Sequence, residues 1–244
     1  MIHYLYLLIS TCESSRMKSV IPLLLSVILL SFSEPLLSQN AVKVLDRVYG
    51  VDQTLCNGKK YNYSVPSSTK GHQFLLSPDF ISGSVTLKGK CYTDIDLNYD
   101  IVNQQLLLQY VDEKGVRKII EVSKAWLTSF TRRNKNFEFL NLEGGPRFYQ
   151  VLGEGPVRIL YYWRKNLNVN DVVGSSNFVF TDPVRDSYLL KDGRLKQYST
   201  KRSLIRLFDP GQRPAIKSHL HKNKFRLKKA SDQEISEKIG RAHV

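Results

Sequence analysis

Apolar and polar residues alternate in short runs along the chain from about residue 74 to residue 181. A period of two is the pattern of a β-strand with one buried face and one solvated face. Turn residues such as Gly89, Gly115 and Gly153 separate the runs. The pattern predicts strands over residues 84–88, 92–101, 106–111, 116–122, 137–142, 147–152, 157–164 and 178–181.

The clearest local signal is a hairpin over residues 187–198, where Asp192-Gly193 separates two strand-like runs. Asp-Gly readily takes the positive φ values of a two-residue hairpin turn. Short strands joined by tight turns indicate an antiparallel meander. We therefore expect a mainly β protein, with an antiparallel meander forming a sandwich or open barrel and a short basic helical C-terminal tail.

The spacing of apolar residues becomes helical beyond residue 203. Leu204–Phe208 form one apolar turn, and Pro214 suits the start of a second helix that carries Leu220. Ser231 and Glu234 have the spacing of a capping box and open a third helix. The tail is therefore expected to be helical and amphipathic.

The N-terminal region has the parts of a secretory signal. Met17 and Lys18 give a basic start, residues 20–32 are apolar, and cleavage after Ser38 is favoured. Residues 17–38 are thus predicted to be a signal peptide, and residues 1–16 an upstream extension ahead of the true start at Met17. The chain is expected to be exported, and periplasmic or associated with the cell envelope.

Two other interpretations of this region compete. A single membrane anchor is disfavoured by Pro22, Glu34 and Pro35 and by the short apolar run. A lipoprotein with Cys12 lipidated lacks a basic start and has Thr11 where a small residue is expected.

After the leader, the expected organisation is a β-rich domain over 39–200 and a basic tail over 201–238. Residues 239–244 match the translation of a common sequencing adapter.

Cys56 and Cys91 are the two cysteines that follow the predicted leader. In an oxidising compartment such a pair indicates a candidate disulfide, although two separate thiols in a core fit as well. No His, Cys or acid lies at ligand spacing beside either cysteine, so no metal site is predicted. No cofactor motif is evident, and we predict none.

Asp94, Asp96, Asn98 and Asp100 alternate with apolar residues and have the opening spacing of a calcium loop. The loop would place Tyr99 where Gly is needed, and Gln105 at the twelfth position where a bidentate Glu is needed. Period-two alternation instead predicts that the four polar groups lie on the solvated face of one strand.

No catalytic residue is predicted. His219 and His221 lie two apart on a predicted helix and point to different faces, while His72 stands alone. No serine or cysteine has an evident local base. The run Tyr161–Lys165 has the composition of a stacking platform for sugars or bases. Tyr161 and Trp163 would share one strand face, however, and such a face is more commonly buried.

The tail over 201–238 holds eleven Lys and Arg against four acidic residues, a net charge of +7 out of +14 for the chain. Clustered positive charge attracts polyanions, although a solvated basic face that binds nothing is equally expected. An envelope protein or an anionic membrane surface is favoured as the partner over nucleic acid. The predicted anion-contacting residues are Lys217, Lys222, Lys224, Arg226, Lys228 and Lys229.

Four further features of the sequence belong together: Gly83-Ser84-Val85 with Gly89 and Tyr92, Leu97–Ile101, the Tyr188-Leu189 hairpin, and the pattern from Ile216-Lys217 through Lys222–Lys224 to Lys228-Lys229. In these features the chain resembles an uncharacterised family of exported proteins from Bacteroidota-type bacteria. The resemblance implies an exported, β-rich protein that starts at Met17. It brings no activity, cofactor or catalytic residue, and the pair Cys56 and Cys91 is not part of it.

The favoured hypothesis is a non-enzymatic envelope protein that acts in binding or assembly. The alternative is a hydrolase or small-ligand carrier that uses a cavity in the β domain, because curled antiparallel sheets often enclose pockets.

Overall fold

The computed structural model describes residues 52–172, 175–222, 225–227 and 230–240. The chain divides between Val51 and Asp52 into two units, and only the second is described. The predicted leader and its alternatives therefore lie outside the described residues. None of the described helices is long and apolar enough to cross a membrane.

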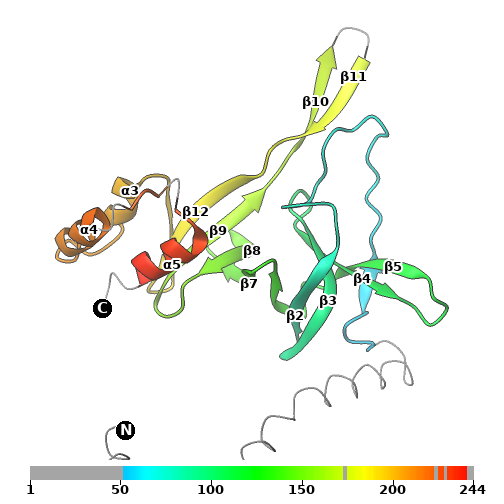
Figure 1. The fold of residues 1–244 in the computed structure, drawn as a ribbon, viewed down its shortest axis with the longest axis horizontal. Helices are drawn as coiled ribbons and strands as arrows, with labels where there is room; N and C mark the ends of the chain where they lie inside the picture. Colours follow the sequence, from blue (N-terminus) through cyan, green and yellow to red (C-terminus); the bar gives the residue numbers. More distant parts are fainter. Residues whose placement is uncertain (1–51, 173–174, 223–224, 228–229, 241–244) are drawn as a thin grey trace, which may run out of the picture. The chain divides into compact units, whose positions relative to one another are not determined.

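The protein is mainly β, as predicted, and one antiparallel sheet contains most of its strands (Figure 1). A separate hairpin pairs β10 (Leu167–Val172) with β11 (Ser175–Phe180). In spatial order the sheet runs β1 (Gly58–Lys60), β5 (Arg117–Val122), β4 (Gln105–Val111), β3 (Lys90–Asp100), β2 (Ile81–Leu87), β6 (Leu127–Arg132), β7 (Lys135–Leu142), β8 (Gly145–Leu152), β9 (Val157–Arg164), β12 (Val184–Lys191) and β13 (Arg194–Tyr198).

Two meanders meet where β2 pairs with β6. The sheet stays open, because β1 and β13 form its two edges. Gly83 lies at the junction, beside a register shift in β2. A Cβ at this position would come within 2.2 Å of the backbone oxygen of Thr131 on β6, so the two strands approach this closely only with glycine there.

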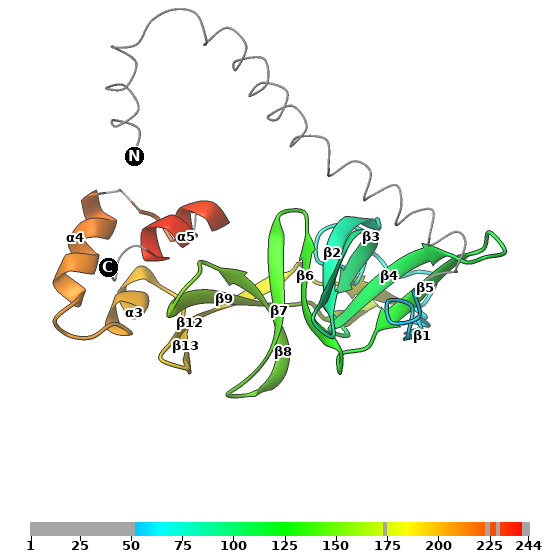
Figure 2. The ribbon, with the colours of Figure 1, turned by 90° about the horizontal axis from the view of Figure 1, so that it is seen from below.

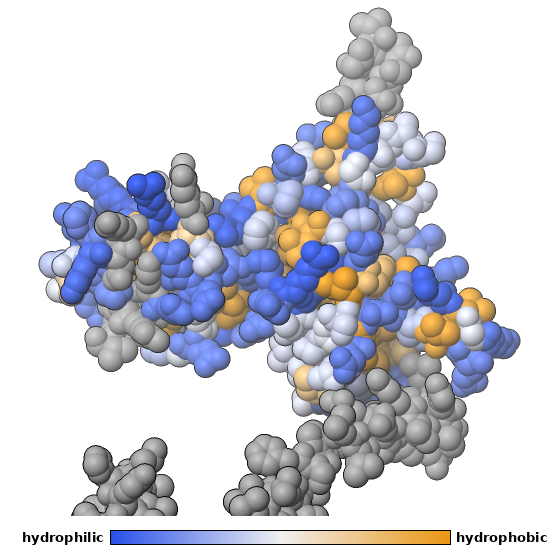
Figure 3. Space-filling view, viewed as in Figure 1, coloured by the Kyte–Doolittle hydropathy of each residue, from blue (hydrophilic) through white to orange (hydrophobic). Residues whose placement is uncertain are grey.

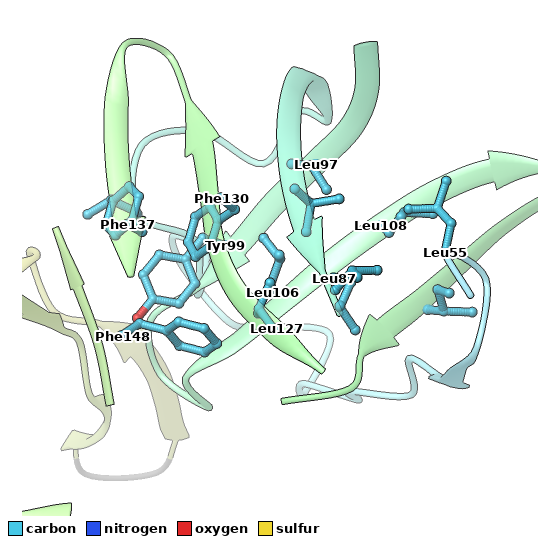
Figure 4. Packing of buried hydrophobic residues seen from close by; sticks show 14 of the residues in the cluster. Leu55, Leu87, Leu97, Tyr99, Leu106, Leu108, Leu127, Phe130, Phe137 and Phe148 are labelled. Atoms are coloured by element: carbon cyan, nitrogen blue, oxygen red, sulfur yellow. The ribbon is translucent and has the colours of Figure 1, made fainter. Parts of the chain in front are cut away.

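The first core cluster lies between the strands of the N-terminal meander and β6–β8 (Figure 4). Its centre is aromatic: the rings of Phe130 and Phe137 stack at 4.6 Å between centroids. Tyr99 meets both of these rings edge-on, and Phe148 meets the Phe130 ring edge-on. These four side chains are at most 2% exposed. Core residues from strands that are distant in the sequence therefore hold this half of the sheet together.

The helical tail lies at the end of the sheet formed by β9, β12 and β13 (Figure 2), and the second core cluster joins the two. The helices are α3 (Lys201–Arg206), α4 (Arg213–Lys222) and α5 (Asp232–Gly240). Leu204, Phe208, Ile216, Leu220 and Ile235 are each at most 2% exposed. They pack with sheet residues that face the same side, namely Leu152, Ile159, Tyr161, Leu189 and Tyr198. The predicted amphipathic tail is therefore part of the folded core.

The predicted Asp-Gly hairpin is confirmed. Asp192 and Gly193 have φ values of 51° and 71°, and they join β12 to β13. The predicted start of the third helix is also confirmed, since the backbone N–H of Glu234 donates to the Ser231 hydroxyl at 3.2 Å. Strands β1, β6 and β10 were not predicted.

The predicted solvated face of β3 is wrong at two of its four positions. Asp94 and Asp96 are exposed, but Asn98 and Asp100 are fully buried. The Asn98 amide donates to the carbonyls of Ser77 and Pro78 at 3.1 and 3.0 Å. The preceding loop therefore covers this end of β3 and satisfies its polar groups, which the local alternation does not reveal.

Candidate functional site

Helices α3 and α4 form a helical hairpin, and two basic residues hold its ends together. At the turn, the Arg213 guanidinium donates to the carbonyls of Phe208 and Arg206, at 2.8 and 2.9 Å. At the open end, the Lys201 ammonium donates to the Leu220 carbonyl at 3.2 Å. Both residues satisfy carbonyls of the tail's own backbone, so their charges serve its structure.

The acidic residue of this hairpin, Asp209, also has a partner within the protein. Asp209, in the turn between α3 and α4, accepts a hydrogen bond from the Lys191 ammonium at the end of β12. This pair lowers the pKa of Asp209. The first turns of α3 and α4 contain no acidic residue. Asp209 is therefore the carboxylate nearest in sequence to these helices, and Lys191 already pairs with it.

Among the described Lys and Arg side chains of the tail, five remain without an assigned contact: Arg202, Arg206, Lys217, Lys222 and Arg226. All five are exposed, and none of them takes part in an ion pair within the described part of the chain. Arg202 and Arg206 are four apart and share one side of α3. On the face seen in Figure 3, hydrophilic side chains predominate over the end of the protein formed by these helices.

Strand β13 extends this charged surface. The register pairs Arg194 with Lys191 and Lys196 with Leu189, so both side chains lie on the sheet face that the helices cover. Both are exposed. Since Lys191 reaches Asp209, the end of the β12–β13 hairpin meets the turn between α3 and α4. We call the seven residues together the basic surface: Arg194, Lys196, Arg202, Arg206, Lys217, Lys222 and Arg226.

Sequence reasoning found three of these seven residues, Lys217, Lys222 and Arg226. The other three predicted contacts, Lys224, Lys228 and Lys229, lie outside the described residues. Arg194 and Lys196 were missed because they precede the tail in the sequence. In β13, Arg194 and Lys196 alternate on the same strand face as Tyr198, which is buried on the helix side. This alternation was the one sequence pattern that could have indicated their position.

The structure does not bring Cys56 and Cys91 together, and Cys91 is an exposed free thiol. Its neighbours Lys90 and Tyr92 both donate to the Asp52 carboxylate, at 2.8 and 3.1 Å. This side of β3 therefore faces the turn that holds Cys56. By strand alternation Cys91 points away from that turn, and the candidate disulfide between the two cysteines is not present in the structure.

A polar network docks α5 on the sheet. The Asp232 carboxylate accepts hydrogen bonds from the Lys135 ammonium and, at 2.7 Å, from the Gln150 amide. The Gln150 carbonyl oxygen accepts from the Trp163 indole N–H at 2.8 Å. Burial raises the pKa of Asp232, but the bonds from Lys135 and Gln150 outweigh it and hold that pKa below its usual value. Ile235, on the same helix, is fully buried.

An open groove of about 730 Å³ lies between this end of α5 and the strands β7 and β8. Its carboxylates include Glu138, Glu154, Asp232 and Glu237. Glu138 is paired with Arg158 at 2.9 Å, and Asp232 is held by Lys135. Among the described residues, no group of three or more His, Cys, Asp or Glu is placed to hold a metal.

The predicted stacking platform is divided between the two faces of the sheet. Tyr161 is 1% exposed in the second core cluster, and Trp163 packs beside it. The Arg185 guanidinium covers both rings, at 4.0 Å and 5.6 Å from their centroids. The protein itself therefore occupies the aromatic face that a sugar or base would need.

Comparison of the chain with models of known protein families, with curated proteins and with solved structures gives no match. The resemblance to an exported family therefore stays a prediction.

Proposed function

We propose that this protein is a non-enzymatic binding or assembly module of the cell envelope, and that the basic surface is its contact surface. The observation that supports the proposal is that different residues of the tail have separate structural and exposed positions. Its apolar side is buried against the sheet, Lys201 and Arg213 hold its backbone, and the remaining described cations stay exposed and uncommitted.

The rigidity of the tail favours binding over a merely solvated charge run. A disordered basic segment must lose backbone entropy when it binds. Here α3 and α4 are already packed through Leu204, Ile216 and Leu220, so a partner meets a preformed array of charges. The local carboxylate Asp209 is taken by Lys191 and competes little for these cations.

The test is a cross-linked pull-down from envelope extract with the full-length chain as bait. The comparison bait carries glutamine at five basic-surface residues: Arg202, Arg206, Lys217, Lys222 and Arg226. A matched control carries glutamine at five exposed basic residues elsewhere, which gives the same change in net charge: Lys59, Lys60, Lys114, Arg117 and Arg133.

We expect the wild-type bait and the matched control to recover the same envelope component, and the basic-surface variant to lose it. Equal recovery by all three baits would contradict the proposal. A bait truncated at Thr200 is unsuitable, because removal of α3–α5 would expose Ile159, Leu189 and Tyr198 of the sheet.

The groove beside α5 supports a second candidate, a small-ligand carrier or hydrolase. Ser236 lines the groove, and Ser236→Trp would fill it. A carrier predicts a small molecule that copurifies with the wild type, is seen by native mass spectrometry, and is lost in the variant. A hydrolase predicts that the same molecule is converted. If the wild type carries nothing, this candidate fails.

A further inference from the structure

We infer that the partner of the basic surface is an anionic membrane surface, which the protein contacts peripherally and without insertion. This inference rests on the proposed function and names the partner of the same surface. It follows from how the cations are spread, from where the apolar residues lie, and from the two strand residues that extend the charge beyond the tail.

The cations are distributed over several elements instead of converging on one point. Arg202 and Arg206 lie on α3, Lys217 and Lys222 on α4, and Arg194 on β13. The α5 groove and the pocket beside β1 are lined by other residues. A discrete phosphate is held by donors that converge on it. Dispersed single charges instead suit a planar partner whose negative charges are themselves spread out, as lipid headgroups are.

The apolar residues on the core side of α3 and α4 are unavailable for insertion. A membrane-inserting amphipathic helix buries its apolar side among the acyl chains. In α3 and α4 the corresponding residues, Leu204, Ile216 and Leu220, are each at most 2% exposed because they pack on the sheet. Contact must therefore be electrostatic, and it should weaken as salt shortens the Debye length.

Strand β13 adds two cations to the basic surface that do not belong to the tail. Arg194 and Lys196 belong to the β domain, yet they lie on the helix side of the sheet, and Lys191, the cross-strand partner of Arg194, reaches Asp209 in the turn between α3 and α4. A planar surface that meets α3 and α4 near this turn would also meet the end of the β12–β13 hairpin. Neutralising this pair should therefore weaken membrane binding although no tail residue is changed.

The experiment is co-sedimentation of the full-length chain with vesicles of phosphatidylcholine, with and without phosphatidylglycerol. We expect binding only to the anionic vesicles, and its loss as the salt concentration rises from about 0.05 to 0.5 M. Each cation near such a surface contributes at most about fivefold in affinity. Arg194→Gln with Lys196→Gln should thus weaken binding severalfold, and the five-residue tail variant more strongly. The matched control should bind like wild type.

The outcomes separate this inference from the proposed function. Equal binding to neutral and anionic vesicles, or binding that survives high salt, would overturn the peripheral electrostatic contact. An unchanged affinity in the Arg194 and Lys196 variant would refute the extended surface. If vesicles do not bind but the pull-down still recovers a protein or nucleic acid through the same cations, the membrane is the wrong partner while the binding module stands. If both assays are insensitive to these residues, both proposals fail.

Discussion

Replacement of Phe208 tests whether the tail and the sheet form one cooperative unit. Phe208 lies just beyond α3, is 1% exposed, and belongs to the cluster that joins the helices to β9 and β13. A buried Phe removes about 150–250 Å² from water, which at about 25 cal/mol per Å² is worth about 4–6 kcal/mol. Measured Phe-to-Ala losses in cores are about 3–5 kcal/mol. We therefore expect Phe208→Ala to lower the free energy of unfolding by about 3–5 kcal/mol.

The assay is urea unfolding combined with amide hydrogen exchange. If the second cluster is one unit, exchange should accelerate in α3 and also in β9 and β13, because the sheet loses the same contact. Arg206→Ala, two residues away and exposed, is the matched control and should stay within about 0.5 kcal/mol of wild type. An unchanged unfolding midpoint, or faster exchange confined to the helices, would refute the idea that the tail completes the core of the sheet.

Three further predictions concern the β domain. The hydrogen bond from Lys90 is the main cause that lowers the pKa of Asp52 to about 2. The carboxylate therefore stabilises the fold above about pH 4, and this stabilisation is lost as the pH falls towards 2. Asp52→Asn should make stability less dependent on pH in this window, by less than about 1 kcal/mol because the carboxylate is 29% exposed. The Lys165 ammonium donates to two backbone carbonyls at 3.0 Å, and Lys165→Met, which leaves them unpaired, should cost about 2–4 kcal/mol in chemical denaturation. Burial lowers the pKa of Lys165, so wild-type stability should rise as the pH increases towards 10.5, and the variant should lack this slope. Gly83→Ala places a Cβ against the backbone of β6 and should lower the melting temperature more than Gly89→Ala, which has open space but a positive φ.

Local alternation predicted most strands of the sheet, but it failed for β6. The inward side chains there are Leu127, Phe130 and Arg132. A register shift between β2 and β6 separates Leu127 from Phe130 by three residues, so the apolar residues do not show a period of two, and the third inward residue is charged. Arg132 is only 2% exposed and donates to the carbonyls of Leu97 and Asp79, at 3.1 and 2.8 Å. Its partners are distant in the sequence, so no local period could predict its burial.

The same cause explains the error on β3. Asp100 is buried because the hydroxyl of Tyr61 and the backbone N–H groups of Val102 and Asn103 donate to its carboxylate. Alternation distinguishes the two faces of a strand, but it does not show that a loop with matching hydrogen-bond donors and acceptors covers the polar face. Prediction from sequence therefore holds for the sheet and fails for the loops that pack on it.

In the candidate site, the sequence predicted the helices and the excess of positive charge but not which cations are used. Lys201, Arg213 and Lys217 look alike in the tail sequence, yet the first two hold backbone carbonyls and the third is uncommitted. This difference makes the charge variants clean tests. Since the residues of the basic surface lie outside the three core clusters, their neutralisation should leave the unfolding midpoint nearly unchanged. Phe208→Ala should do the opposite, lowering stability while it keeps every charge. If anionic vesicle binding follows the charges and not the stability, the basic surface itself makes the contact; if it follows stability, the intact fold of the tail is what the partner requires.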